Sequence, residues 1–288
     1  MRLKINMNNN YILDTTILID LYFGSRSRKK IIEKKVRDSQ KYATYLILGE
    51  FNRTILDTVR KILNLFLRTE NLLDEYVSID DFVQDVIKDM YFFSSQEASR
   101  IIKLIPYLKA EIKSKIEKYQ KFDIPLKYPI EKIIDDVNLY RTHLLSKIIP
   151  LESSYECQNY LRQLILKLDE KRIIFEKPFC TLCENKTLTY FKDEYPTELE
   201  IFNKNIEILT EQFRKDEKEK FKNALISLLE ISKETKLDSR KHICWNLIDI
   251  FLVLEAPIDF IILTTNLRHQ ESFAKCIKKQ ITDIKIVE

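Results

Sequence analysis

The stretch YILDTT, residues 11–16 of the 288-residue chain, joins a short apolar run to residues that favour a helix start. Asp and Thr side chains accept hydrogen bonds from the first N–H groups of a helix, so we expect a strand over 11–13 and a helix over 17–22. A second apolar run, FIIL at 260–263, lacks polar alternation, which is typical of a strand buried on both faces. These two stretches predict strands of one parallel sheet.

Strands and helices alternate in both terminal regions, which predicts an α/β fold with helices flanking a parallel sheet. The expected elements are strand 11–13, helices 17–22 and 26–37, strand 42–48 and helix 50–67, then helix 243–254, strand 260–263, helix 270–279 and strand 282–287. Helical periodicity marks segments near 80–93, 95–120, 130–148, 155–170 and 197–234. We therefore expect residues 1–68 and 240–288 to form one discontinuous domain, with a mainly helical insertion over 69–239.

Composition narrows the classes of function. The 48 Lys and Arg residues exceed the 44 Asp and Glu residues enough for a net charge of +4, which neither establishes nor excludes a nucleic-acid partner. The only glycines are Gly24 and Gly49. Because a phosphate-binding loop needs several closely spaced glycines, a nucleotide cofactor bound in that way is excluded.

The cysteines and the apolar segments indicate a reducing compartment. Five scattered cysteines do not resemble the disulfide framework of a small secreted domain. The first ten residues lack the apolar core of a signal peptide, and the apolar stretch 247–263 is interrupted by acids and a proline. We therefore expect a cytoplasmic protein with no membrane partner.

Three acids stand where parallel strands present ligand-binding residues. Asp14 follows the first strand, Glu50 follows the second, and Asp249 lies near the start of the helix that leads to the third. Carboxylates gathered at one rim repel each other unless cations lie between them, and Mg²⁺ and Mn²⁺ prefer oxygen ligands. Acids at helix starts are also favourable without any function, because they cap N–H groups and complement the helix dipole. The three acids are therefore consistent with a metal site and with a purely structural role at helix starts.

Four segments in order resemble the acidic motifs of the PIN-domain ribonucleases. They are YILDTTILID at 11–20, YLILGEF at 45–51, LIDI at 247–250 and ILTTN at 262–266. The resemblance covers about residues 10–68 and 240–288. It implies a PIN-like sheet and a hydrolase that cuts RNA as a metal-dependent endoribonuclease, using Mg²⁺ or Mn²⁺ to activate water and leaving 5′-phosphate and 3′-hydroxyl ends.

Transferred position by position, the resemblance makes Asp14, Glu50 and Asp249 the catalytic carboxylates and ligands of Mg²⁺ or Mn²⁺. Thr16 would orient the first acid through a hydrogen bond, and Thr265 and Asn266 would line the same rim.

The chain departs from the family pattern in two respects. Leu267 stands where the family usually has a fourth acid, so a carboxylate that would bind a second metal ion is missing. Asp259 and Glu255 are the alternatives, but residues ahead of a strand should point away from the rim. The interval between Glu50 and Asp249 is also far longer than in a compact family member, which is tolerated if the insertion folds on its own.

The incomplete acid set supports an alternative function: a catalytically degenerate PIN-like module that binds RNA or a protein partner. A third interpretation is a helical interaction protein with the α/β ends as scaffold. RNA is the partner expected for the nuclease. Because related toxins have an inhibitory protein, an inhibitory or regulatory protein partner is also a candidate.

Cys180 and Cys183 have the spacing of half a zinc site, a zinc knuckle at 180–183. A tetrahedral site needs two more ligands, which could come only by tertiary approach. The candidates are His143, Cys157, His242 and Cys244. Ordinary thiols and, less in keeping with the local sequence, redox chemistry are the alternatives to Zn²⁺.

A basic segment follows the first acidic motif. It includes Arg26, Arg28, Lys29 and Lys30. These side chains could contact a nucleic-acid backbone next to the site, or they could form an ordinary solvated helix face.

Overall fold

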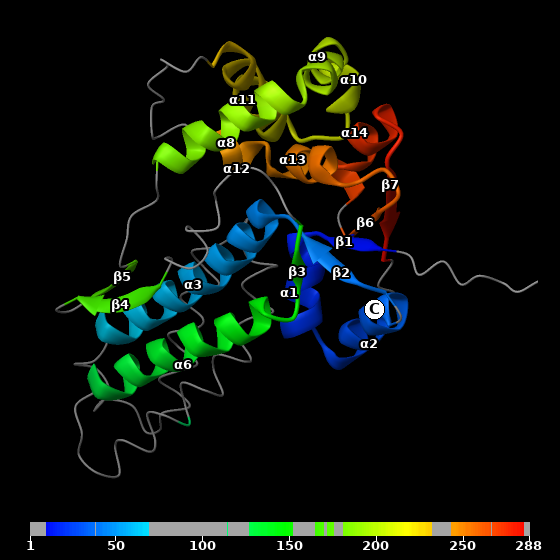
Figure 1. The fold of residues 1–288 in the computed structure, drawn as a ribbon. Helices are drawn as coiled ribbons and strands as arrows, with labels where there is room; N and C mark the ends of the chain where they lie inside the picture. The colour runs from blue at the N-terminus through cyan, green and yellow to red at the C-terminus, as the bar shows by residue number, and fades with distance from the viewer. Residues whose placement is uncertain are drawn as a thin grey trace, which may run out of the picture.

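The computed structural model describes residues 10–37, 39–68, 114, 127–151, 165–169, 172–175, 181–231, 243–265 and 267–284. Within these ranges the chain is mixed α/β, with a five-stranded, fully parallel sheet flanked by helices (Figure 1). The strands of this sheet are β1 (Tyr11–Leu13), β2 (Lys41–Ala43), β3 (Ile149–Pro150), β6 (Ile261–Thr264) and β7 (Gln280–Asp283).

Strand β1 is the centre of the sheet, whose order is β3-β2-β1-β6-β7. Ile12 is opposite Tyr42 of β2 on one side and opposite Ile262 of β6 on the other. All three residues of β1 are buried, as expected for a parallel strand covered on both faces. The strands expected at 11–13 and 260–263 therefore pair directly as β1 and β6, although about 250 residues separate them.

The direction in which the chain adds strands reverses between β1 and β6. From β1 the chain proceeds outward to β2 and β3, whereas β6 is followed by β7 on the other side. Open α/β sheets generally bind ligands at the carboxyl ends of the strands next to such a reversal. The topology alone therefore marks the ends of β1 and β6 as the place to look for a site.

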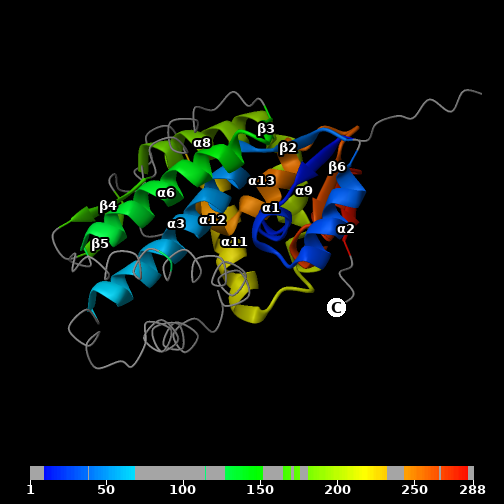
Figure 2. The ribbon, with the colours of Figure 1, turned by 90° about the horizontal axis from the view of Figure 1, so that it is seen from below.

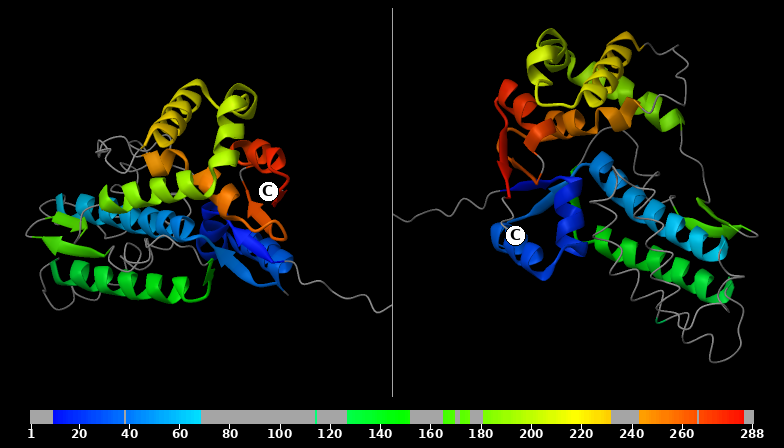
Figure 3. Two further views of the ribbon diagram at one scale, coloured as in Figure 1. Left: turned by 45° about the horizontal axis from the view of Figure 1, so that its top comes forward. Right: turned by 180° about the vertical axis from the view of Figure 1, so that it is seen from behind.

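The helices next to the sheet lie on opposite sides of it. Helices α1 (Thr15–Phe23) and α2 (Arg26–Val36) are on one side, and α13 (Ile248–Glu255) and α14 (Glu271–Cys276) are on the other (Figures 1 and 3). Helix α1 ends at Gly24, where a Cβ atom would be 2.3 Å from the carbonyl oxygen of Asp20. Only glycine fits this close approach, which allows α2 to fold back onto α1.

Two long helices run side by side away from the sheet. They are α3 (Tyr45–Arg68) and α6 (Lys127–Leu145), and the antiparallel hairpin of β4 (Leu166–Asp169) and β5 (Arg172–Phe175) lies at their far end (Figure 2). The side chain of Asn64 bonds both the N–H and the C=O of Ile173, at 2.7 and 2.9 Å. The Asn64 amide satisfies the backbone groups of Ile173 that a neighbouring strand would otherwise bond, and it attaches the hairpin to α3.

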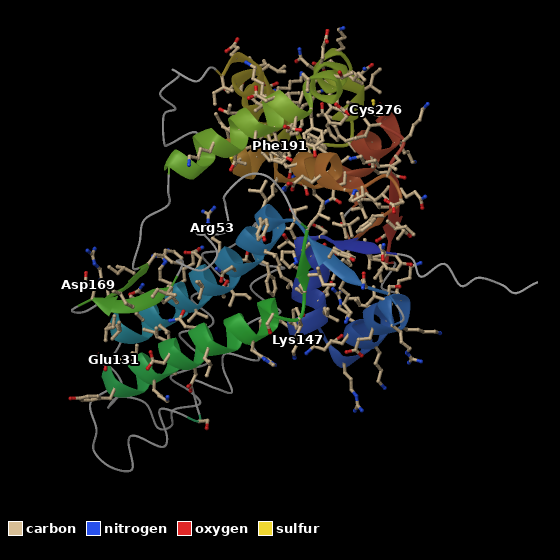
Figure 4. The ribbon with its side chains drawn as sticks, viewed as in Figure 1. Arg53, Glu131, Lys147, Asp169, Phe191 and Cys276 are labelled. Atoms are coloured by element: carbon tan, nitrogen blue, oxygen red, sulfur yellow. The ribbon has the colours of Figure 1, made fainter. Side chains whose placement is uncertain are left out.

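The remaining α-helices form a group on the α13 and α14 side of the molecule (Figure 1). They are α8 (Thr181–Glu194), α9 (Pro196–Lys204), α10 (Ile206–Leu209), α11 (Lys215–Glu230) and α12 (Ile243–Asn246). Phe191 of α8 stacks on Phe251 of α13 with ring centroids 3.8 Å apart, and Figure 4 shows Phe191 where α8 faces that helix. Phe202 of α9 meets Phe273 of α14 edge to face. Residues 181–231 thus share a core with the helices that flank the sheet. Aromatic pairs stabilise such a core because each ring buries a large apolar area.

Several expected boundaries were wrong. The run 42–48 was expected to be a strand, but β2 ends at Ala43 and helix α3 already begins at Tyr45. The hydroxyl of Thr44 accepts from the N–H of Ile47 at 3.2 Å and starts the helix there. A fully buried apolar run suits a strand and a helix equally, so periodicity alone could not separate them. The last strand is also displaced, from 282–287 to Gln280–Asp283.

The middle of the chain, expected to be mainly helical, also contributes strands. Strand β3 pairs in parallel with β2, so the sheet is not formed by the chain ends alone. The helix expected over 155–170 is wrong for Leu166–Asp169, which form β4. The expected helices over 80–93 and 95–120 lie outside the described residues except for residue 114. In the described part of the chain, no helix is long and apolar enough to span a membrane.

Candidate carboxylate site at the ends of β1 and β6

Asp14 lies directly at the reversal point of the sheet. Its backbone N–H continues the sheet ladder to the C=O of Leu263 at 3.0 Å, and its side chain is the N-cap of α1. The carboxylate is 4% exposed and accepts from the N–H of Thr15 at 2.7 Å and from the hydroxyl of Thr264 at 3.0 Å. A buried carboxylate requires such donors, and these hold it in one orientation.

Thr16 and Thr265 extend this arrangement. The Thr16 hydroxyl, to which the family resemblance assigned the orientation of the first acid, donates to Oδ2 of Asp14 at 2.7 Å. The N–H of Thr265 in turn donates to the Thr16 hydroxyl at 3.4 Å. Asn266, expected at the same rim, lies outside the described residues. The contact from Thr264 was missed, although its place at the strand end, beside Thr265, was a usable signal.

Glu50 reaches this site from α3. It lies in the second turn of that helix rather than directly after the strand, and its carboxylate accepts a hydrogen bond from the Thr15 hydroxyl. Because the N–H of the same threonine donates to Asp14, Thr15 joins the two carboxylates. The structure thus brings together Asp14 and Glu50, which are 36 positions apart by the difference of their residue numbers.

Asp249 lies in a second cluster, in the first turn of α13. Its Oδ1 accepts from Nε2 of Gln270 at 2.8 Å, and its Oδ2 is 3.4 Å from Nδ1 of His269. Gln270 is 1% exposed, whereas the Asp249 side chain is one-third exposed. The sequence carries no local signal for the pairing of His269 with Asp249, which depends on tertiary structure.

An ion-pair network anchors the short helix η2 (Leu267–His269) to α11. The Glu217 carboxylate contacts Arg268 and lies 3.6 Å from Nε2 of His269, while Nε of Arg214 donates to it at 2.9 Å. Burial raises the pKa of Glu217, but hydrogen bonds from Arg214 and the charges of Arg268 and His269 outweigh it and lower the pKa to about 2. Leu267, at the place of the family's fourth acid, is the first residue of η2.

The donor chemistry of the first cluster fits a hard divalent cation. Mg²⁺ is commonly held by one or two carboxylates together with water and substrate phosphate, and Asp14 and Glu50 supply such a pair next to hydroxyl groups. Among the described residues, no three or more His, Cys, Asp or Glu side chains form a group that could hold a metal ion. The described structure therefore offers a carboxylate pair and places Asp249 with Gln270 and His269.

The basic residues of α2 divide into two kinds. Nη1 of Arg28 lies 3.3 Å from Oδ1 of Asp20, a fully buried acid on α1, so Arg28 ties α2 to α1. Arg26 and Lys30 are exposed and Lys29 is half-buried. Helix α2 begins beyond the end of α1, whose nine residues rise about 14 Å from Asp14. These cations are therefore separated from Asp14 by the length of α1.

The proposed zinc ligands are mostly outside the described structure. Cys180 is not described, and Cys183 lies in α8 with its side chain not described. Of the additional candidates, His143 is exposed on α6 and Cys244 is buried on α12. The zinc knuckle stays a prediction.

No family model, curated protein or solved structure matches this chain.

Proposed function

We propose that the chain is a PIN-like, metal-dependent endoribonuclease whose α/β domain carries a mainly helical insertion. The observation that carries this proposal is the position of the Asp14–Glu50 pair at the point where the sheet reverses its direction of growth. Paired carboxylate oxygens at this position are suited to a cation that contacts a phosphodiester.

In this proposal the protein residues position the reacting groups. Asp14 and Glu50 hold Mg²⁺ or Mn²⁺, which when bound lowers the pKa of a water molecule and neutralises phosphate charge. Thr15, Thr16 and Thr264 keep the Asp14 carboxylate from rotating, so little reorganisation is needed when substrate binds. The exposed cations of α2 contact the RNA backbone away from the cleaved bond.

The experiment is RNA cleavage by the purified chain in Mn²⁺, in Mg²⁺ and in EDTA, compared with Asp14→Asn. Asp259→Asn is the matched control, because Asp259 is exposed. It precedes the amino end of β6, whereas Asp14 follows the carboxyl end of the neighbouring strand β1. We expect cleavage only with metal, abolished by Asp14→Asn and unchanged by Asp259→Asn. Cleavage that persists in folded Asp14→Asn would falsify the proposal.

A second candidate function is a non-catalytic PIN-like module that binds RNA or a regulatory protein. It is favoured by one observation: Asp249 contacts Gln270 and His269, and no three-acid group forms in the described residues. Retained RNA binding by a folded chain that cuts no RNA in either metal would support this function over the nuclease.

A further inference from the structure

Two arginines that are far apart in sequence converge on one carboxylate. Glu217, in the first turn of α11, accepts from Nε and Nη2 of Arg214 at 2.9 and 2.5 Å and from the backbone N–H of the same residue at 3.0 Å. Its Oε2 also contacts Nη2 of Arg268, which lies in η2, and is 3.6 Å from Nε2 of His269. A single negative charge is thus surrounded by donors from two separate parts of the chain.

The arginine pair, Arg214 and Arg268, lies near the candidate carboxylate site. Thr264 donates to the Asp14 carboxylate, and Arg268 follows Thr264 by four positions. Because an extended chain spans at most about 3.6 Å per residue, the Cα atoms of Thr264 and Arg268 lie within about 14 Å of each other. Arg268 is therefore near enough for one RNA strand to contact both it and the carboxylate site.

Glu217 uses only part of the Arg268 guanidinium. Nη2 of Arg268 contacts the carboxylate, whereas its Nε is buried and has no hydrogen-bond partner among the described residues. Glu217 is tethered to α11 and is also bonded to Arg214, so it meets one arm of the guanidinium fork. Arginine binds phosphate most strongly through two parallel N–H donors. A phosphate group that is not tethered to the helix can align with both.

The surroundings of Glu217 favour a negative charge. Burial raises the pKa of Glu217, but hydrogen bonds from Arg214 and the charges of Arg268 and His269 outweigh it and lower the pKa to about 2. A phosphodiester in RNA also carries one negative charge, so it can replace the carboxylate without altering the charge balance. The side chains of Arg214, Arg268 and Glu217 are all partly exposed, so a ligand can reach them from solvent.

We propose that the arginine pair is a binding site for one phosphate of an RNA strand, and that the Glu217 carboxylate occupies this site until RNA displaces it. The inference rests on the proposed function, because it takes RNA as the substrate and assigns this phosphate to a position away from the cleaved bond. Glu217 belongs to the expected insertion over 69–239. In this role the insertion competes with RNA and restrains its binding.

The test is the binding of a fluorescein-labelled single-stranded RNA to the full chain in EDTA, measured by fluorescence anisotropy, so that metal-dependent cleavage does not interfere. Glu217→Gln keeps the size of the side chain and removes its charge. We expect it to tighten RNA binding about 3- to 10-fold, since a charged group no longer competes for the arginines. Glu219→Gln is the control, because Glu219 is exposed on the same helix and the change in net charge is equal.

Arg268→Gln should have the opposite effect. We expect it to weaken RNA binding about 3- to 10-fold and to reduce the slope of log affinity against log salt concentration by about 0.7, the value for one phosphate contact with a single strand. Arg172→Gln is the control, because Arg172 is exposed on β5 and the charge change is the same. If Arg268→Gln does not fold, Arg268→Lys, which keeps the charge and loses the fork, replaces it.

A purely structural ion pair predicts a different result. Glu217→Gln would then lower the unfolding midpoint without tightening RNA binding more than Glu219→Gln does. In the proposed role, most of the gain from Glu217→Gln disappears in an Arg268→Gln chain, because the donor that Glu217 occupies is absent.

The outcomes separate this inference from the nuclease proposal. Equal RNA affinity of folded Glu217→Gln and Glu219→Gln overturns the phosphate site, whether or not the chain cuts RNA. Opposite effects of Glu217→Gln and Arg268→Gln, in a chain that cuts no RNA with either metal, support the phosphate site and overturn the nuclease. Absence of RNA binding by both the unmodified chain and Glu217→Gln overturns the phosphate site, and the cleavage assay then decides the nuclease separately.

Discussion

The hydroxyl of Thr264 donates a 3.0 Å hydrogen bond to the carboxylate of Asp14 across 250 positions of sequence. Both groups are buried, and both lie at the carboxyl ends of the neighbouring parallel strands β6 and β1. This contact joins the N-terminal and C-terminal parts of the sheet at the point where its direction of growth reverses. It therefore contributes both to the sheet and to the candidate site.

Replacing Thr264 by valine keeps the shape of the side chain and removes its donor. We expect the free energy of unfolding to fall by about 1–3 kcal/mol, since a hydrogen bond to a charged group is lost while that group stays buried. The measurement is urea unfolding. Thr282→Val, at a half-buried position opposite Leu263 in β7, is the control and should change stability less. Equal losses in the two variants would show that the Asp14 contact is not special.

Glu217 should make stability depend on acid pH. Its pKa is lowered from 4.5 to about 2 in the folded chain, so its contribution is complete above the unfolded value and is lost as pH falls toward 2. Glu217→Gln should therefore cost about 1 kcal/mol at pH 7, a value reduced by solvent screening of these partly exposed groups. The difference from the unmodified chain should shrink between about pH 4.5 and pH 2.

Unfolding midpoints at pH 7 and at several acid pH values measure this difference. Glu219→Gln is the control, because Glu219 is exposed on the same helix. A Glu217→Gln chain whose deficit stays constant down to pH 2 would exclude an ionised Glu217 as the source of the effect.

Lys278 adopts a left-handed backbone conformation, with φ of 58°, directly after α14. The N–H of Lys279 reaches back to the C=O of Ala274 at 2.8 Å, which closes the helix end. Glycine reaches this conformation without steric cost, so Lys278→Gly should stabilise the chain by about 0.5–1 kcal/mol. Thermal unfolding measures it. Lys275→Gly, inside the last turn of α14, should have the opposite sign; a destabilised Lys278→Gly chain would contradict the prediction.

Asn64 should control the attachment of the β4–β5 hairpin to α3. Asn64→Leu removes two hydrogen bonds to the backbone of Ile173 and leaves its N–H and C=O without these partners. We expect a loss of about 1–3 kcal/mol and faster hydrogen exchange of the Ile173 amide. Asn223→Leu, at an exposed position of α11, should leave that amide unchanged. Unaltered exchange at Ile173 in Asn64→Leu would mean that other contacts hold the hairpin.

The sequence by itself determined the central strands and the helix that follows the first of them. A three-residue apolar run followed by Asp14 and Thr15 allows little besides a buried strand and an N-capped helix, because both signals act over neighbouring residues. The uninterrupted apolar run before Thr264 indicated its strand for the same reason. These local signals were enough to predict an α/β fold with a parallel sheet.

Only the tertiary structure decided which acids lie together. Glu50 approaches Asp14 through Thr15, whereas Asp249 is held by Gln270, and neither pairing has a local signal in the sequence. Strand β3 likewise joins the sheet from the middle of the chain with only two residues. Such contacts depend on how helices and strands far apart in sequence pack around one core, and their energies are gained only when the whole chain has folded.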